Sequence, residues 1–210
     1  MQTLKKPLSI KIIYWITNIT FWIYSAVTVF AIGLAFSFIF KFLNETQLHV
    51  GIPVGVDILE KGTLDLDLHS TYIDVEFKEM YGKIHFINTP AALGQIYGFF
   101  MLVMISLFYY IFLTFRKFIN NVYKGYYFDI DNISLLKNIS YTMVVVWFFT
   151  VFYAYFQYFY LVKNLQFNTV EIGSDVNSYP TILLAALLIW VLSHIFMKGC
   201  KLEEENNYTI

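Results

Sequence analysis

The sequence has little cysteine and little net charge. It contains a single cysteine, Cys200, and a formal net charge of −1 over 210 residues. One cysteine excludes an intramolecular disulfide, a thiol–disulfide redox pair and a multi-cysteine metal site. The near-neutral charge provides no general basic field for direct binding of nucleic acid. Charged residues form only 14% of the chain, whereas 58% is hydrophobic and 20% aromatic, which excludes a soluble domain with an ordinary polar surface.

Asp, Glu, Lys and Arg are absent from four long hydrophobic blocks. The blocks cover residues 12–40, 92–115, 139–162 and 179–197. Each is about as long as the 20 apolar residues that cross a bilayer as a helix, and a backbone in hydrocarbon must satisfy its own hydrogen bonds. The sequence therefore predicts an all-α membrane protein, a four-transmembrane-helix bundle in contact with the lipid bilayer. The first block is too long for a signal peptide, so we expect a retained anchor.

Basic residues are distributed unequally between the two sides of the predicted membrane. Nine Lys and Arg residues lie in the N-terminal segment, the second connection and the C-terminal tail, against five in the first and third connections. The positive-inside rule places the more basic side in the cytoplasm. We therefore expect a multi-pass protein of the cell (inner) membrane with both termini cytoplasmic.

The first connection, residues 44–90, shows an alternating apolar and polar pattern. It alternates over 64–69, 72–77 and 83–88, which is typical of half-buried strands. The sequence predicts a small extracytoplasmic antiparallel β subdomain between the first two helices. We expect a three-stranded meander with turns at 70–71 and 79–82, and a loop at 51–56. The third connection, 163–178, is expected to pack beside this sheet.

Histidines and acidic residues occur together in that first connection. His49, His69 and His85 lie among several Asp and Glu residues. A metal site is conceivable, but solvated polar residues on a strand are far commoner. The sequence therefore predicts no metal ligands and no cofactor.

The second connection, residues 116–138, contains signals for a turn followed by a helix. Gly125 allows a turn, Asp129 is a suitable N-terminal helix cap, and Ile133, Leu136 and Ile139 form one apolar stripe. We predict a short amphipathic helix that lies along the inner leaflet and turns into the third span. Its exposed face is expected to carry contacts with a partner protein. The candidate residues are Asn132, Lys137 and Asn138. A packed interfacial connector without a partner is the alternative.

This connection resembles that of a known family. The pattern Gly125-x-x-Phe128-Asp129-x-x-Asn132-x-x-x-Leu136-x-x-Ile139, between a second and a third span, is similar to domain-of-unknown-function family 2975 of bacterial membrane proteins. The resemblance implies about four spans. It also implies a regulatory partnership, because genes of the family often lie beside one for a small helix-turn-helix regulator. It implies no activity and supplies no catalytic residue.

Small and polar residues within the spans predict helix packing. Gly94-x-x-x-Gly98 opens the second span, and small residues at this spacing let helix backbones approach closely. We interpret the pair as packing within the bundle, with a homo-oligomer face as the alternative. Asn18, Gln157 and His194 are polar residues inside spans, and ordinary hydrogen bonds between helices explain them. A proton or ion path would need several charged groups, which the spans lack.

Aromatic side chains dominate the third span. Most residues between Trp147 and Tyr160 are Phe, Tyr or Trp. We interpret them as core packing with an aromatic belt at the membrane surface. A groove for a lipid or quinone tail is the alternative.

No motif of a known catalytic chemistry is present. The sequence has no nucleophile elbow, zinc-protease helix, P-loop or dinucleotide fingerprint, so no catalytic residue is predicted. The function favoured by the sequence is that of a non-enzymatic regulatory or envelope-sensing partner of a cytoplasmic protein. The alternative is a small transporter or an accessory subunit of a membrane transport complex.

Overall fold

The structure is a computed structural model that describes residues 7–42, 51–66, 71–85, 90–127, 129–165, 171–172, 176 and 178–208. The chain divides into two compact units. The first, here called the helical unit, comprises residues 1–42, 92–150 and 179–210. The second, here called the β unit, comprises residues 43–91 and 151–178. Each unit is described by itself.

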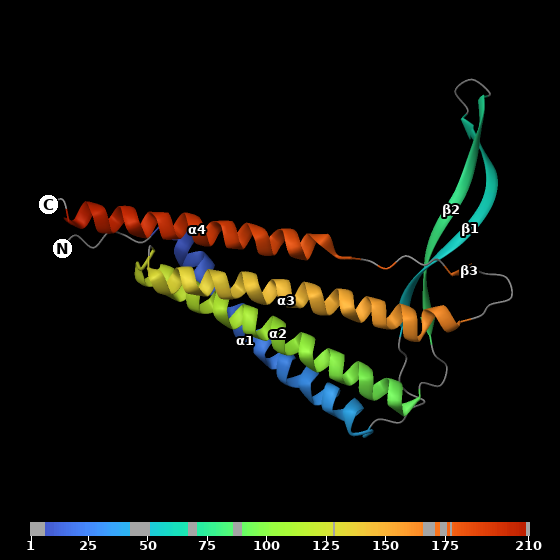
Figure 1. Cartoon of the computed structure of the whole chain (residues 1–210), viewed down its shortest axis with the longest axis horizontal. Coiled ribbons are helices and arrows are strands. Elements are labelled where there is room, and N and C mark those ends of the chain that lie inside the picture. Colours follow the sequence, from blue (N-terminus) through green and yellow to red (C-terminus); the bar gives the residue numbers. More distant parts are fainter. Residues whose placement is uncertain are drawn as a thin grey trace. The chain divides into compact units, whose positions relative to one another are not determined.

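Four long helices account for most of the described residues. They are α1 (Leu8–Ile39), α2 (Ala91–Lys124), α3 (Ile130–Tyr160) and α4 (Pro180–Tyr208) (Figure 1). All four are long and apolar enough to cross a membrane. Large apolar side chains are exposed along them, for example Trp22, Phe30 and Leu188 at 60% or more. Such a surface is stable against hydrocarbon but not against water. The protein is therefore a multi-pass membrane protein.

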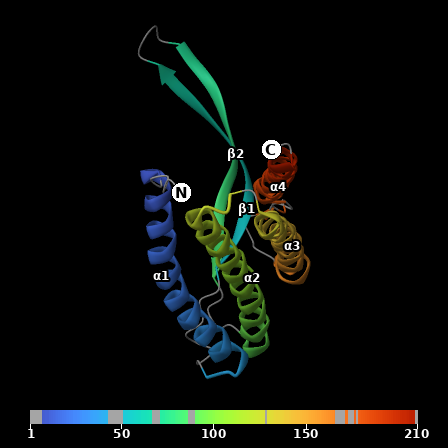
Figure 2. The same ribbon diagram turned by 90° about the vertical axis from the view of Figure 1, so that its left-hand side faces the viewer.

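The helices of the helical unit lie next to one another in the order α1, α2, α3, α4 (Figure 2). Stacked rings join α1 to α2, with Phe21 and Phe112 at 6.2 Å between centroids. The rings of Phe100 and Phe149 join α2 to α3 at 5.2 Å. Between α3 and α4 the contact is polar. Buried Ser140 donates to the backbone carbonyl of Ala186 at 2.8 Å, and Ala186 is fully buried.

The helix boundaries on both sides of the second connection differ from the sequence prediction. Helix α2 continues to Lys124 instead of ending near residue 115, and α3 begins at Ile130 instead of near residue 139. The residues of the predicted amphipathic helix form the first turns of α3, the helix into which it was expected to turn. The physical reason is that no Gly or Pro interrupts residues 116–124 or 130–138, so nothing stops either helix. The connection between α2 and α3, here called the α2–α3 connection, is therefore short and covers residues 125–129.

The β unit contains a hairpin of two long strands and one short strand. They are β1 (Gly51–Leu66), β2 (Thr71–His85) and β3 (Glu171–Ile172), in the antiparallel order β2-β1-β3. Strand β3 belongs to the third connection, so this connection lies beside β1, as expected from the sequence.

The predicted meander is wrong in its first and last parts. The segment 51–56 is not a loop, because it pairs with β2 from Gly51 opposite His85 to Val56 opposite Met80. This pairing also extends β2 through residues 79–82, where a turn was predicted. Residues 67–70, which include part of the other predicted turn, lie outside the described residues. Pairing gives the backbone N–H and C=O groups of residues 51–56 their hydrogen-bond partners. The alternation of apolar and polar residues in the sequence does not show this pairing.

A small apolar core holds the β unit together. Val56 of β1 and Val162 are both buried, at 6% and 8% exposure, and Ile84, Tyr158, Leu161 and Ile172 pack against them. Val162 begins the short 3₁₀ helix η2 (Val162–Asn164), which follows α3. The end of α3 therefore contributes directly to the core of the sheet.

Candidate functional site

Gly125 directly follows α2, and hydrogen bonds around it close the C-terminal end of the helix. Gly125 has φ +101°, a left-handed conformation that glycine adopts without steric cost. Its N–H donates to the carbonyl of Val122 at 3.1 Å, and the N–H of Tyr126 donates to the carbonyl of Asn121 at 3.1 Å. These two bonds are the pair that defines a Schellman terminus. The geometry therefore favours glycine at this position.

Asp129 lies immediately before α3. Its Oδ1 accepts a hydrogen bond from the N–H of Asp131 at 3.1 Å, and its carbonyl accepts from the N–H of Asn132 at 3.0 Å. The first N–H groups of a helix have no partner within the helix, and a carboxylate at this position satisfies one of them. Asp129 thus makes the hydrogen bond expected of the predicted cap.

Asn132 lies in the first turn of α3 and is 0% exposed. Its Nδ2 donates to the carbonyls of Tyr126 and Tyr127, and its Oδ1 accepts from Nδ2 of Asn121 at 3.0 Å. The prediction that Asn132 belongs to an exposed partner face is wrong. An asparagine carries two donors and one acceptor group that can all point into the α2–α3 connection, and here all three are used.

The remaining predicted residues of this region divide between a buried and an exposed face. Ile133, Leu136 and Ile139 are buried at 6%, 7% and 3% exposure, as the apolar stripe requires. Lys137 is partly exposed and Asn138 is exposed. Of the candidate partner-contact residues, the structure therefore leaves Asn138 open and Lys137 partly open. Phe128 of the sequence motif lies outside the described residues.

Gly94 and Gly98 are both buried in α2. A Cβ on Gly98 would lie 2.9 Å from the backbone oxygen of Ala35 and 3.0 Å from Cβ of Phe38, both in α1. Gln95 on the same turn donates from Nε2 to the carbonyl of Ile39 at 2.9 Å. Because Gly98 has no side chain, α1 can approach α2 closely at this position within one chain.

Asn18 of α1 meets Arg116 of α2. The Nε of Arg116 donates to Oδ1 of Asn18 at 2.9 Å, while Nδ2 of Asn18 donates to the carbonyl of Tyr14 at 2.9 Å. The guanidinium carbon of Arg116 lies 4.0 Å from the ring centroid of Phe21 and 5.9 Å from that of Trp22. The structure thus adds a cation to a position where the sequence indicated only a neutral polar residue.

The other two polar residues inside the spans make local contacts. In the β unit, Nε2 of Gln157 donates to the hydroxyl of Tyr153 at 2.9 Å, within α3. His194 of α4 has Nδ1 at 3.0 Å from the carbonyl of Trp190, and the two rings meet edge to face. These contacts join residues of the same helix, whereas hydrogen bonds between helices were expected.

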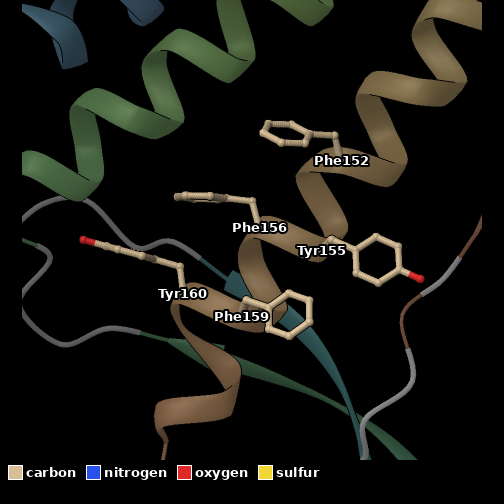
Figure 3. Close-up of a pocket in the computed structure, with 5 residues that line it drawn as sticks. All are labelled: Phe152, Tyr155, Phe156, Phe159 and Tyr160. Carbon is tan, nitrogen blue, oxygen red and sulfur yellow. The ribbon is translucent and has the colours of Figure 1, made fainter.

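Aromatic rings line a shallow groove on the last turns of α3, in the β unit. Its volume is about 340 Å³. Phe152, Phe156 and Tyr160 project from one side of the helix, and Tyr155 and Phe159 project from the other (Figure 3). Phe156 stacks on Tyr160, and Tyr155 stacks on Phe159, with interplanar angles of 14° and 16°. Four of these rings are about half exposed, so core packing does not account for these four, whereas Phe149 and Tyr158 do pack on other elements.

Two participating residues were not identified from the sequence. Asn121 completes the hydrogen bonds of Asn132, but a lone asparagine near a helix end carries no specific signal. Arg116 was treated as one of several basic residues at the membrane boundary. Its distinguishing signal was available, because it is the only arginine among the 14 Lys and Arg residues.

No group of three or more His, Cys, Asp or Glu residues suited to a metal ion occurs among the described residues. His49 and His69, considered above as metal ligands, lie outside those residues.

Comparison with known proteins gives one match. A family model described as "Protein of unknown function (DUF2975)" matches residues 76–210. The matched range includes α2, the α2–α3 connection, α3 and α4. No curated protein and no solved structure matches the chain.

Proposed function

The chain belongs to the DUF2975 family of proteins of unknown function, and we propose that it is a non-enzymatic regulatory membrane protein. In this proposal it senses a condition outside the cytoplasm and transmits it to a soluble cytoplasmic protein. The observation that carries the proposal is the path of α3. This helix begins at the hydrogen-bonded α2–α3 connection and ends two residues before Val162 in the core of the β unit.

Helix α3 contributes residues to both units. At its first turn, Asp129 and Asn132 fix the helix to the connection. At its other end, Tyr158, Leu161 and Val162 pack with the strands. A helix with intact backbone hydrogen bonds is stiff along its axis. A change that repacks the β unit would therefore be transmitted along α3 to the residues of its first turns.

The proposed orientation comes from the charge asymmetry. The termini and the second connection carry nine of the 14 basic residues, which favours a cytoplasmic location for these segments in a bacterial inner membrane. The β unit would then face the outside. Its backbone register places Asp57 of β1 opposite both Glu79 and Glu171. Three acidic residues thus occupy one row across the sheet, which favours the β unit as the part that meets a signal.

The partner surface differs from the one expected from the sequence. Because Asn132 is buried, the surface proposed here consists of the exposed residues Asp131, Ser134 and Asn138, together with partly exposed Lys137. Asp131, Ser134 and Asn138 follow one another at intervals of three and four residues, and Lys137 lies three residues after Ser134, so all four share one side of α3. They begin directly after the capped terminus, where α3 is fixed by hydrogen bonds. The family resemblance suggests a small helix-turn-helix regulator as the partner.

Site-specific photocrosslinking in cells tests this proposal. A photoreactive amino acid at Ser134 or Asn138 should capture a small helix-turn-helix regulator encoded by a neighbouring gene. The matched control is Tyr141, which is exposed on the next turn of the same helix at 56% and should capture lipid. Capture of lipid alone at all three positions would contradict the proposed partner surface.

A further inference from the structure

The side chain of Arg116 is held in a fixed orientation by three residues of α1. Asn18 accepts the hydrogen bond from Nε, and the rings of Phe21 and Trp22 lie near the guanidinium carbon. Asn18 is itself oriented, because its amide nitrogen donates to the carbonyl of Tyr14 one turn earlier. This bond turns Oδ1 of Asn18 toward Arg116. The arginine is therefore preorganised by neutral groups.

These contacts use only part of the guanidinium. An arginine carries five N–H donors in a planar fork, and the hydrogen bond to Asn18 occupies the one on Nε. The two terminal amino groups, with four donors, take no part in that hydrogen bond. Within the part of the chain that the structure describes, the partners of Arg116 are an amide and two aromatic rings, and none is a carboxylate. A partly buried cation arranged in this way is complementary to an anion that accepts two parallel hydrogen bonds.

The place of Arg116 in the sequence defines where that anion lies. Arg116 is the first charged residue after the uncharged run 92–115, and Lys117 follows it. It lies about two turns before the end of α2 at Lys124. On α1, Trp15 and Trp22 are 62% and 67% exposed on either side of Asn18, and tryptophan is enriched at the level of lipid headgroups. Arg116 therefore lies where hydrocarbon meets phosphate.

From these observations we infer that Arg116 binds the phosphate of an anionic membrane lipid, with Asn18 as its positioning residue. The terminal amino groups of Arg116 donate to two phosphate oxygens in the bidentate geometry that guanidinium and phosphate share. The acyl chains lie along the exposed apolar surface of α1, which includes Trp22 and Ile23. A free phosphate ion has the same chemistry, but the headgroup layer holds lipid phosphate at this depth.

Lipid binding to the full-length protein in detergent tests the inference. Phosphatidylglycerol and diacylglycerol with the same acyl chains are titrated separately, and bound lipid is counted by native mass spectrometry. The wild-type protein should bind phosphatidylglycerol and should bind the phosphate-free lipid about tenfold more weakly. Arg116→Gln should weaken phosphatidylglycerol binding by about the same factor. The matched control is Lys117→Gln, which removes one charge from the next, exposed residue and should change binding by less than about twofold.

A conservative variant separates recognition from loss of fold. Arg116→Lys keeps the positive charge, so this variant should fold as wild type. It removes the Nε hydrogen bond and the planar fork, so it should bind phosphatidylglycerol several-fold more weakly than wild type. Equal binding by wild type, Arg116→Gln and Arg116→Lys would overturn the inference. An equal loss in Lys117→Gln would also overturn it, because diffuse attraction would then explain the affinity. Displacement of the lipid by millimolar inorganic phosphate would show a site for free phosphate, and would overturn the lipid assignment.

Discussion

The side-chain amide of Asn121, near the end of α2, donates a hydrogen bond to the side-chain carbonyl of Asn132, in the first turn of α3, at 3.0 Å. Asn132 in turn donates to the carbonyls of Tyr126 and Tyr127 between the two helices. One buried amide thus joins both helix ends and the chain that links them. Asn132, one residue of the sequence motif, therefore also fixes the fold of the α2–α3 connection.

Replacement of Asn132 should destabilise the helical unit strongly. Asn132→Leu removes three hydrogen bonds of a fully buried amide, and each hydrogen bond contributes about 0.5–1.5 kcal/mol. We expect a loss of about 3 kcal/mol in the free energy of unfolding. Unfolding by SDS in mixed micelles, followed by circular dichroism, measures it. The control is Asn138→Leu on the exposed side of the same helix, and equal stability of the two variants would contradict the assigned role of Asn132.

Gly125 should tolerate asparagine better than alanine. Its φ of +101° lies in the left-handed region, where a residue with a Cβ atom costs about 1–2 kcal/mol, and asparagine is less disfavoured than alanine. No atom lies within 4 Å of the position that a Cβ would occupy, so backbone strain is the expected cause of any loss. The same SDS titration should rank wild type above Gly125→Asn and Gly125→Asn above Gly125→Ala. An alanine variant as stable as wild type would show that the turn has another conformation.

Asp129 should be replaceable by serine but not by alanine. Serine can accept the same backbone hydrogen bond, whereas alanine cannot, and loss of a cap costs about 1 kcal/mol. Limited proteolysis in detergent should cut the α2–α3 connection faster in Asp129→Ala than in wild type or Asp129→Ser. If Asp129→Ser is cut as fast as Asp129→Ala, then the carboxylate has a role other than capping.

The sequence predicted the four spans because their signal is local. An uncharged run such as 92–115 predicts a membrane span from its own residues alone. The cap at Asp129 likewise depends on only a few neighbouring residues. The sequence did not predict which polar residues lie inside. Asn132 and Asn138 are the same residue type six positions apart, yet one is fully buried and the other exposed. The difference depends on partners such as Asn121, which lies on another helix.

The strand pairing and the contact of Arg116 with Asn18 also could not be predicted from the sequence, because each depends on residues far apart in the chain. Residues 51–56 form a strand because residues 80–85 pair with them. No pattern within 51–56 indicates which segment they pair with. The contact of Arg116 with Asn18 joins residues 98 positions apart in the sequence. Each residue alone has an ordinary explanation, as a boundary cation and as a polar residue in a span. Only the packing of α1 on α2 combines them into one site.

Gly98 and Gly33 should respond to alanine in opposite ways. At Gly98, a Cβ would lie 2.9 Å from the backbone oxygen of Ala35, whereas at Gly33 nothing lies within 4 Å. Gly98→Ala must push α1 and α2 apart and should cost about 1–3 kcal/mol, as overpacking does. Gly33→Ala should be neutral or stabilising by up to about 1 kcal/mol, because alanine favours a helix. Both free energies come from unfolding in SDS, and an equal loss at the two positions would show that contact with Ala35 is not the cause.

The proposed orientation predicts which residues are accessible from outside the cell. Single cysteines at Lys61, exposed in β1, and at Lys124, exposed at the end of α2, are introduced after Cys200→Ser has removed the native thiol. If the basic side faces the cytoplasm, Lys61→Cys should react with a membrane-impermeant maleimide in intact cells. Lys124→Cys should react only after permeabilisation. Because both positions are exposed, a difference in labelling reports the side of the membrane and not burial. The reverse labelling pattern would place the β unit in the cytoplasm and would contradict the proposed direction of signalling.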